Sequence, residues 1–333
     1  MKGIKILAHK VNYDSGVMVS VRHLSNVLGK TGVPCDLDFY VDDDELKRKA
    51  SLCKSSCLNI QGMSFRNDTI YEILNRHKNV VVSIHSTMCN LQVEGDALPR
   101  LLELGKKGNR NLTFTCPSES ETCGLNSFMQ VKYKYLPNTF SYETHSEEIT
   151  DRVLKKKISD RPVRISLICA YRPFKNMITQ VAAVIMLAED RPVELHIFDT
   201  AQKSPVYHNI MAMLENSKVR LVMHEQAGNA ECFKKEGMFD LGLQVSLSET
   251  FSYVAFEHMI QGVPVIGSTS VPFSSEVARY SDVTDIKKKM EKILSNDTIY
   301  RRYALEAQNK ANAVLEQNNL TAVKTVNELI GRL

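Results

Sequence analysis

The sequence predicts an α/β protein built from two doubly wound parallel sheets. Three observations lead to this prediction. Short runs rich in Val, Ile and Leu alternate with helical patterns along the whole chain, as expected for parallel strands buried on both faces. Ten such runs are more than one ordinary open sheet holds. The alternation also lapses once, near the middle of the chain, which divides the runs into two sets.

The strand-like runs come in two sets of five, each set interrupted by helical stretches. The first helix is expected at residues 17–29, closed by Gly32, and each run of the second half precedes a helical stretch. The predicted strands are residues 4–10, 35–41, 80–86, 112–118 and 133–138 in the first half, and 163–170, 193–199, 219–225, 241–247 and 263–268 in the second.

The lapse sets the domain boundaries. The segment following Phe140 is polar and charged and shows no strand pattern. We therefore expect a first domain at residues 1–142, a linker at 143–162 and a second domain at 163–333. The last helix of the second domain could return to the first. The alternative is a long surface loop within a single domain.

Composition limits the class of protein. The chain has 333 residues, 43% of them hydrophobic, which is enough for two ordinary cores. It shows no signal-peptide pattern and no run of 18 apolar residues, so we expect no membrane span. The eight cysteines are scattered, and only Cys53 and Cys57 are close. Because this spacing fits neither a disulfide framework nor a zinc site, we expect a cytoplasmic protein with reduced thiols.

The net charge of +4 lies entirely in the first half. Residues 1–140 hold 18 basic residues (Lys and Arg) and 14 acidic residues (Asp and Glu), whereas the remaining residues hold 24 basic and 24 acidic residues. This asymmetry indicates an acidic partner for the first half or a contribution to solubility alone.

Candidate ligand-binding residues follow the predicted strands, because ligands of open parallel sheets bind beyond the carboxyl ends of the strands. Gly16 opens the first helix, whose N–H groups could hold an anion; the alternative is an ordinary strand-to-helix turn. His85 lies at the carboxyl end of the run 80–86 and could equally be a packing residue. Arg172 and Lys175 lie in one turn and suit a diphosphate, or form a surface ion-pair turn. Glu225 precedes the polar loop 226–229.

Two glutamates eight residues apart raise the sharpest question. The helix predicted at about 253–261 ends at Gly262 and Pro264, so Glu249 lies in the loop before it and Glu257 inside it. Glu257 shares a face with apolar side chains, which is costly for a carboxylate without a partner. A core-edge carboxylate paired with a lysine is the simpler alternative.

With these residues in view, the chain resembles retaining glycosyltransferases of family 4, which have the GT-B fold of two Rossmann-like domains facing a cleft. The family pattern E-x-F-G-x4-E-A-M-x-x-G-x-P-V-I is matched from Glu249 to Ile266. Two departures stand within it, because Ser252 replaces a glycine and His258 replaces an alanine. Arg172 and Lys175 match the family's Arg…Lys turn, and His85 matches its N-domain histidine. Ser118 and residues 135–138 match part of a motif before the linker. The Arg–Lys spacing is shorter than in many members, and Gly16 lacks the usual second glycine.

The resemblance implies a transfer of a hexose or pentose from a nucleoside diphosphate to an acceptor hydroxyl, with retention of configuration and no cofactor or metal. Glu257 would bond the donor ribose, and Glu249 the transferred sugar together with His85. The donor diphosphate would lie against Arg172, Lys175 and the backbone near Phe251 and Ser252, with Gly16 and Glu225 completing the donor site. Residues 42–44, all aspartates, are expected to form a charged loop rather than a metal site.

Two rival functions and several acceptors stay open. One rival is a nucleotide-sugar-binding protein without activity. The other is a Rossmann-type oxidoreductase, which the missing GxGxxG motif disfavours. The acceptor could be a glycan or a lipid-linked sugar. By analogy with compact viral enzymes of this fold it could also be a hydroxymethylated base in DNA, approached through Lys47, Arg48 and Lys49.

Overall fold

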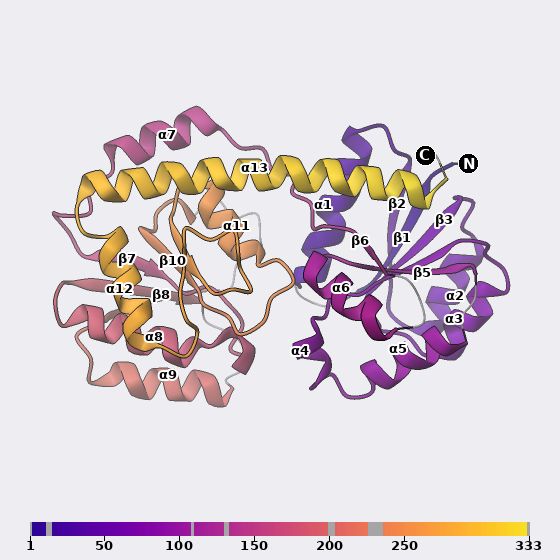
Figure 1. Ribbon diagram of the computed structural model, residues 1–333, viewed down its shortest axis with the longest axis horizontal. Helices are drawn as coiled ribbons and strands as arrows, with labels where there is room; N and C mark the ends of the chain where they lie inside the picture. The colour runs from indigo at the N-terminus through magenta and orange to yellow at the C-terminus, as the bar shows by residue number, and fades with distance from the viewer. Residues whose placement is uncertain are drawn as a thin grey trace. The chain divides into compact units, whose positions relative to one another are not determined.

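The structure is a computed structural model that describes residues 2–10, 15–107, 110–129, 133–198, 204–225 and 236–331. The chain divides into two compact units. The first comprises residues 1–142 and 315–333, and the second comprises residues 143–314. Figure 1 shows that each unit has its own sheet with helices packed around it.

The first unit holds, in its described part, a six-stranded parallel sheet with strand order β2-β1-β3-β4-β5-β6. The chain therefore reverses its direction of winding between β1 and β3. The strands are β1 (Ile4–His9), β2 (Cys35–Tyr40), β3 (Cys57–Gln61), β4 (Val80–Ser83), β5 (Leu112–Cys116) and β6 (Tyr133–Tyr135), and the helices are α1 (Gly16–Lys30), α2 (Asp43–Ser51), α3 (Asn67–Leu74), α4 (Met88–Leu91), α5 (Ala97–Lys106) and α6 (Glu119–Phe128).

Alternation along the strands gives this sheet two apolar faces. In β1, Ile4 and Ile6 belong to a core shared with α1, whereas Leu7 belongs to the core on the other face with α2, α3 and α5. Successive side chains of a strand point to opposite faces, so a continuous apolar strand must be covered on both sides. Helices cover both faces for this reason.

The second unit holds, among the residues described, another six-stranded parallel sheet, ordered β12-β11-β10-β7-β8-β9. Here the winding reverses between β7 and β10. The strands are β7 (Val163–Ser166), β8 (Val193–Phe198), β9 (Arg220–His224), β10 (Leu241–Gln244), β11 (Val265–Gly267) and β12 (Glu276–Val277), and the helices are α7 (Ser146–Lys155), the 3-10 turn η1 (Pro173–Lys175), α8 (Met177–Ala188), α9 (Pro205–Glu215), α11 (Tyr253–Ile260), α12 (Val283–Ile293) and α13 (Asp297–Leu329).

The predicted fold class is confirmed, and each of the ten predicted strands contains an observed one. Two strands were not predicted. β3 has every residue buried, but Asn59 and Gln61 interrupt its apolar pattern. β12 has only two residues, too few to give a periodic signal.

Residues 143–162 contain α7 and belong to the second unit. Ile149, Val153 and Ile158 lie in its core, so this segment is part of the packed structure. The boundary between the units near residue 314 falls inside α13, and Ala322 and Val326 of that helix lie in the core of the first unit. Within the described ranges, no helix is both long enough and apolar enough to span a bilayer.

A buried ion cluster fastens the segment after α7 to the start of β10. The side chain of Asp240 is fully buried and accepts two hydrogen bonds from Arg161, at 2.7 and 2.8 Å, and a third from the Arg164 backbone at 2.9 Å. Lys156 lies 3.1 Å from the same carboxylate. Burial alone raises the pKa of Asp240, but Arg161 and Lys156 outweigh it, so the pKa is lowered.

We expect Asp240→Asn to reduce the free energy of unfolding by about 3–5 kcal/mol at pH 7, because it leaves buried cations without their counter-charge. A lowered carboxyl pKa stabilises the fold above the pKa of the unfolded chain, and this contribution disappears as the pH falls through the folded value. The gap between wild type and variant should therefore narrow below about pH 4.

Urea unfolding at several pH values measures this gap. The matched control is Asp190→Asn, because Asp190 pairs with Lys287 at 2.6 Å but is 57% exposed; it should cost at most about 1 kcal/mol. Equal losses for the two variants would contradict the assignment of Asp240 as the buried anchor.

Candidate functional site

The reversal of winding between β7 and β10 places two loops side by side at the carboxyl edge of the second sheet. Such reversals are where open parallel sheets bind ligands, because the loops that follow the two strands turn away to opposite faces. The loop after β7 carries Arg172 and Lys175, and the loop after β10 carries Glu249. The predicted turn and the predicted glutamate therefore meet at the same switch point.

Backbone-directed hydrogen bonds tie these two loops together. Gln180, fully buried in α8, accepts from the Val245 N–H at 2.8 Å and donates to the Lys175 carbonyl at 2.8 Å. Asn176 has the left-handed φ of 52° and donates to the Val245 carbonyl at 3.0 Å. The Leu247 N–H donates to the Phe174 carbonyl at 2.8 Å. These bonds fix the two loops in a single relative position.

The tethered loops bring Lys175 and Glu249 into contact. The Lys175 ammonium lies 2.5 Å from Oε1 of Glu249, and the Ser246 hydroxyl donates to the same oxygen at 2.8 Å. The side chains of Lys175 and Glu249 are 20% and 10% exposed, so both can still be reached by a ligand. Arg172 is exposed and precedes η1.

The loop after β10 ends in a conformation that favours glycine. Ser252, at the start of α11, has φ 66°, in the left-handed region that costs an ordinary residue roughly 1–2 kcal/mol. The glycine of the family pattern meets this demand without that cost. Ser252 makes no side-chain cap for the helix, while Phe251 is anchored against Phe256 and Phe273 with ring centroids 5.4 and 5.3 Å apart.

Glu257 lies in α11 with only 3% of its surface exposed. Its Oε1 is buried and has no hydrogen-bond partner within the described chain. Burial raises the pKa of Glu257 to about 8, because an apolar surrounding disfavours the charged form. The simpler alternative was that Glu257 pairs with a lysine. Among the described residues of this site, the glutamate that pairs with a lysine is Glu249 and not Glu257.

His258, the other departure from the family pattern, has a packing role. It is 1% exposed, hydrogen-bonds through Nδ1 to the Val254 carbonyl at 2.8 Å and through Nε2 to Ser166 at 2.9 Å. Burial lowers its pKa to about 4. A Cβ at Gly242 would lie 3.0 Å from the His258 ring, so the glycine in β10 provides the room that the larger side chain needs.

The remaining predicted donor residues are less constrained. Gly16 is the exposed first residue of α1, and a Cβ there would meet nothing within 4 Å. Glu225 is exposed just after β9. Residues 226–229 lie outside the described ranges.

In the first unit, His85 follows β4 and is partly buried. Its Nε2 lies 2.6 Å from Oε1 of Gln61, and burial lowers its pKa to about 4. Ser118 caps α6 by accepting from the Glu121 N–H at 3.3 Å, and buried Asn138 accepts from Ser20 at 2.5 Å. Ser118 and Asn138 therefore have hydrogen-bond partners within the first unit.

The basic residues predicted on the acceptor side lie on α2 and are paired locally. Lys47 contacts Glu72 at 2.9 Å, Lys49 contacts Asp38 at 2.8 Å, and the exposed Arg48 contacts Glu45 at 3.3 Å. The aspartates before them were expected in a loop, but Asp42 caps α2, and Asp43 and Asp44 lie in its first turn. Asp43 bonds Arg66 and Thr69, and Asp44, which is 93% exposed, lies 4.0 Å from Lys47. Among the described residues, no group of three or more His, Cys, Asp or Glu side chains could hold a metal.

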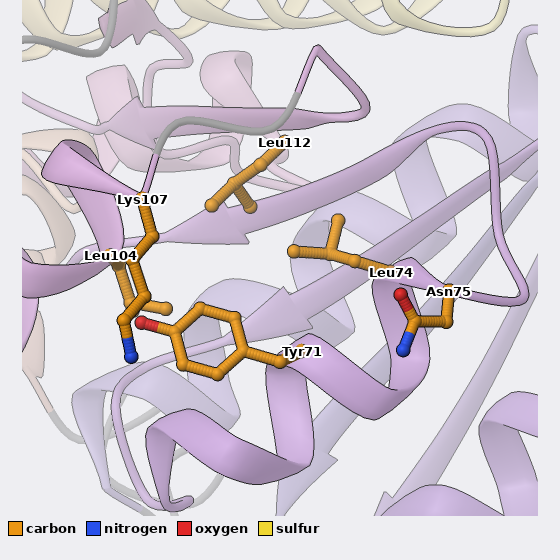
Figure 2. Close-up of a pocket in the computed structure, with 6 residues that line it drawn as sticks. All are labelled: Tyr71, Leu74, Asn75, Leu104, Lys107 and Leu112. Carbon is orange, nitrogen blue, oxygen red and sulfur yellow. The ribbon is translucent and has the colours of Figure 1, made fainter.

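A small pocket of about 80 Å³ lies elsewhere in the first unit. Figure 2 shows it between the end of α3, the end of α5 and the start of β5, with Tyr71 and Lys107 among the residues that line it. Lys107 lies 4.4 Å from the centre of the Tyr71 ring. Because Leu112 begins β5, this pocket opens at the amino edge of the sheet, opposite the edge where ligands are expected.

Sequence reasoning missed the side chains that hold the loops in place. Gln180 is a lone amide in the apolar helical run 177–188, and a polar residue on such a face indicates a specific hydrogen-bond partner. That signal was present in the sequence. The partner, the Val245 N–H, is 65 residues away, and no local pattern identifies it.

The buried state of Glu257 predicts a pH-dependent stability. With a folded pKa raised to about 8, the folded protein keeps a proton that the unfolded chain has lost, so stability falls as pH rises from about 4.5 to about 8. Glu257→Gln removes this effect. The melting temperature of Glu257→Gln minus that of the wild type should therefore increase between pH 5 and pH 8. For Glu306→Gln, which changes an exposed glutamate, this difference should not change with pH. A pH-independent difference for Glu257→Gln would contradict this.

No protein-family model matches the sequence, and no curated protein does. Solved structures do match over nearly the whole chain. A sucrose-phosphate synthase from Thermosynechococcus elongatus has a TM-score of 0.75 at 14% identity, covering 99% of this chain and 100% of that one. HepE from Anabaena in complex with UDP has a TM-score of 0.69 at 14% identity, covering 99% and 100%.

A third structure, a UDP-forming α,α-trehalose-phosphate synthase from Burkholderia xenovorans, has a TM-score of 0.64 at 10% identity and covers 86% of this chain and 76% of that one. At these identities the likeness concerns the fold. Together with the two parallel sheets, it identifies the fold as GT-B.

Proposed function

We propose that the protein is a glycosyltransferase that moves a sugar from a nucleoside diphosphate to an acceptor hydroxyl. The observation that carries this proposal is Glu257, a buried carboxyl in the helix that follows the switch-point loop. Its Oε1 has no hydrogen-bond partner among the residues that the structure describes. A buried carboxyl of this kind is stabilised by hydroxyl groups that donate to it. The paired hydroxyls of a ribose provide two such donors.

The same loops suit the diphosphate that follows the ribose. Lys175 and Arg172 supply positive charge on one loop. The start of α11, where Ser252 leaves the first N–H groups without a side-chain cap, supplies backbone donors and the positive end of a helix dipole. A nucleoside diphosphate with its ribose at Glu257 and its phosphates at Lys175 would provide hydrogen-bond partners for the buried Glu257 oxygen and for the uncapped N–H groups of α11.

The reaction depends on stabilising the leaving group. The bond between the anomeric carbon and the diphosphate oxygen breaks, and a bond from that carbon to the acceptor oxygen forms. The acceptor hydroxyl loses its proton, which the departing diphosphate can accept. Negative charge grows on the diphosphate in the transition state, and preorganised cations at Arg172 and Lys175 lower its energy. Glu249 would then bind hydroxyls of the transferred sugar.

The donor we favour is a uridine diphosphate sugar, because one similar solved structure is a complex with UDP and another is a UDP-forming synthase. Retention of the anomeric configuration is proposed from the match between Glu249 and Ile266 and the family 4 pattern. The transferred sugar is a hexose or a pentose.

The acceptor is proposed only as a hydroxyl group. Lys47 and Lys49 are occupied by carboxylates of their own unit, so α2 offers little unpaired positive charge for nucleic-acid phosphates. A DNA acceptor stays a prediction without structural support. A glycan or lipid-linked acceptor is equally compatible with the site.

We expect Lys175→Ala and Arg172→Ala each to lower turnover of a UDP-sugar by about 10²–10³-fold, corresponding to about 2.7–4 kcal/mol per lost donor. A screen of UDP-sugars for hydrolysis and transfer measures this.

The control is Lys288→Ala, because Lys288 is an exposed lysine on α12; it should retain wild-type turnover. Melting curves establish that the variants are folded. Wild-type turnover in both loop variants would remove the phosphate assignment. Binding of UDP without any turnover by the wild type would favour the inactive binding protein instead.

A further inference from the structure

A row of buried polar side chains crosses the carboxyl edge of the sheet in the first unit. Gln61 of β3, Ser83 of β4 and Thr115 of β5 are register partners on adjacent strands, and Asn59 lies two residues before Gln61 on the same face. All four are at most 3% exposed. Burying a polar group costs free energy unless it forms hydrogen bonds, so four buried polar side chains on one face indicate a hydrogen-bonded network with a specific role.

The row forms a directed chain of hydrogen bonds. Oδ1 of Asn59 accepts from Nε2 of Gln61 at 2.6 Å and from the Ser83 hydroxyl at 3.1 Å. Nε2 of Gln61 also donates to Ser83 at 3.2 Å, and Ser83 and Thr115 are 2.7 Å apart. Because the Gln61 amide nitrogen donates to Asn59 and Ser83, the Gln61 amide oxygen points away from these two residues.

That oxygen meets His85. Oε1 of Gln61 lies 2.6 Å from Nε2 of His85. An amide oxygen can only accept, so Nε2 of His85 must carry the hydrogen. In a neutral imidazole the other nitrogen, Nδ1, then holds a lone pair. Within the described chain Nδ1 forms no hydrogen bond, and His85 is only partly buried.

We propose that Gln61 is a positioning residue that holds His85 in the Nε2-protonated tautomer, so that Nδ1 accepts a hydrogen bond from a substrate hydroxyl. This inference rests on the proposed function, because it assigns the hydroxyl to a sugar or to its acceptor. The interior row fixes the orientation of the Gln61 amide, and the amide in turn fixes the ring. A ring held by one nitrogen loses little further freedom when a substrate binds to the other.

The environment keeps this arrangement in place at neutral pH. Burial lowers the pKa of His85 to about 4, so the ring stays neutral and Nδ1 remains an acceptor. An imidazolium would carry a hydrogen on both nitrogens and could not accept from a hydroxyl. The network therefore selects a ligand group that donates, such as a sugar hydroxyl, over one that only accepts.

The tautomer can be read directly from the imidazole ¹⁵N chemical shifts of the ¹⁵N-histidine-labelled full chain, with His85→Ala identifying the signals of this ring among nine histidines. We expect a protonated Nε2 and an unprotonated Nδ1 in the wild type. Gln61→Leu should produce a mixture of tautomers. Thr115→Ala, which leaves both hydrogen bonds of the Gln61 amide nitrogen in place, should keep the wild-type tautomer. A protonated Nδ1 in the wild type, or an unchanged spectrum in Gln61→Leu, would overturn the proposal.

A second readout uses hydrolysis of UDP-glucose as the probe. Gln61→Leu should lower kcat/KM about tenfold, in keeping with the loss of one well-placed hydrogen bond. The same substitution should have no further effect in a His85→Ala background, because Gln61 acts through that ring. A tenfold loss in both backgrounds would assign Gln61 a role independent of His85 and overturn the inference.

The two experiments separate the two proposals. If the wild type turns over no UDP-sugar, the proposed function fails, while the spectra still decide the tautomer. If turnover is present but the spectra show a protonated Nδ1, the assignment of Gln61 alone fails.

Discussion

The candidate site of the second unit depends on the hydrogen bonds that cross its switch point. Gln180 and Asn176 connect the loop after β7 to the end of β10, and both use backbone groups of that strand as partners. Without them the two loops would be free to separate, and Lys175 would lose its fixed distance from Glu249. The positive φ values of Asn176 and Ser252 bracket this arrangement, because each lies where a loop turns into a helix. Strain of this kind persists only where the surrounding contacts determine the backbone, and it gathers at functional sites.

The two sheets place polar chemistry at their carboxyl edges by different means. The second unit uses a surface-accessible ion pair between loops, with one buried carboxyl behind it. The first unit uses a buried amide and hydroxyl row that ends at His85. In both, an amide deep in the apolar interior sets the geometry of a group nearer the surface: Gln180 for the Lys175 loop and Gln61 for His85. The Asp240 cluster lies at the opposite edge, where the fully buried Asp240 joins the segment after α7 to β10.

Much of the architecture could be predicted from the sequence, because the apolar runs 80–86 and 241–247 contain strands whose every residue is buried, a pattern that indicates parallel strands. β3 could not be recognised in the same way, since the polar row that passes through Asn59 and Gln61 hides its apolar character. At the site, Glu249, Glu257, Arg172 and Lys175 could be chosen from spacing and resemblance. Their arrangement could not, because Gln180 and Val245 or Lys175 and Glu249 are far apart in the chain and meet only once the sheet is folded. The pairing of Lys47 and Lys49 with carboxylates on neighbouring elements is likewise a property of the folded unit, so excess charge in the sequence overstated the basic surface.

The central claim is that Oε1 of Glu257, which has no hydrogen-bond partner among the described residues, accepts from the ribose of a nucleoside diphosphate. Calorimetric titration of the wild type and of Glu257→Gln with UDP and with 2′,3′-dideoxy-UDP tests it most directly. At about pH 9, above the pKa of about 8 that burial gives Glu257, the carboxylate is charged. Hydrogen bonds to charged groups contribute about 1.5–3 kcal/mol, so removal of the ribose hydroxyls at this pH should weaken binding to the wild type by about 10- to 100-fold. In Glu257→Gln the two ligands should bind with affinities within about threefold of each other, because the charged acceptor is gone. Equal affinity of the wild type for UDP and its dideoxy analogue would contradict the account.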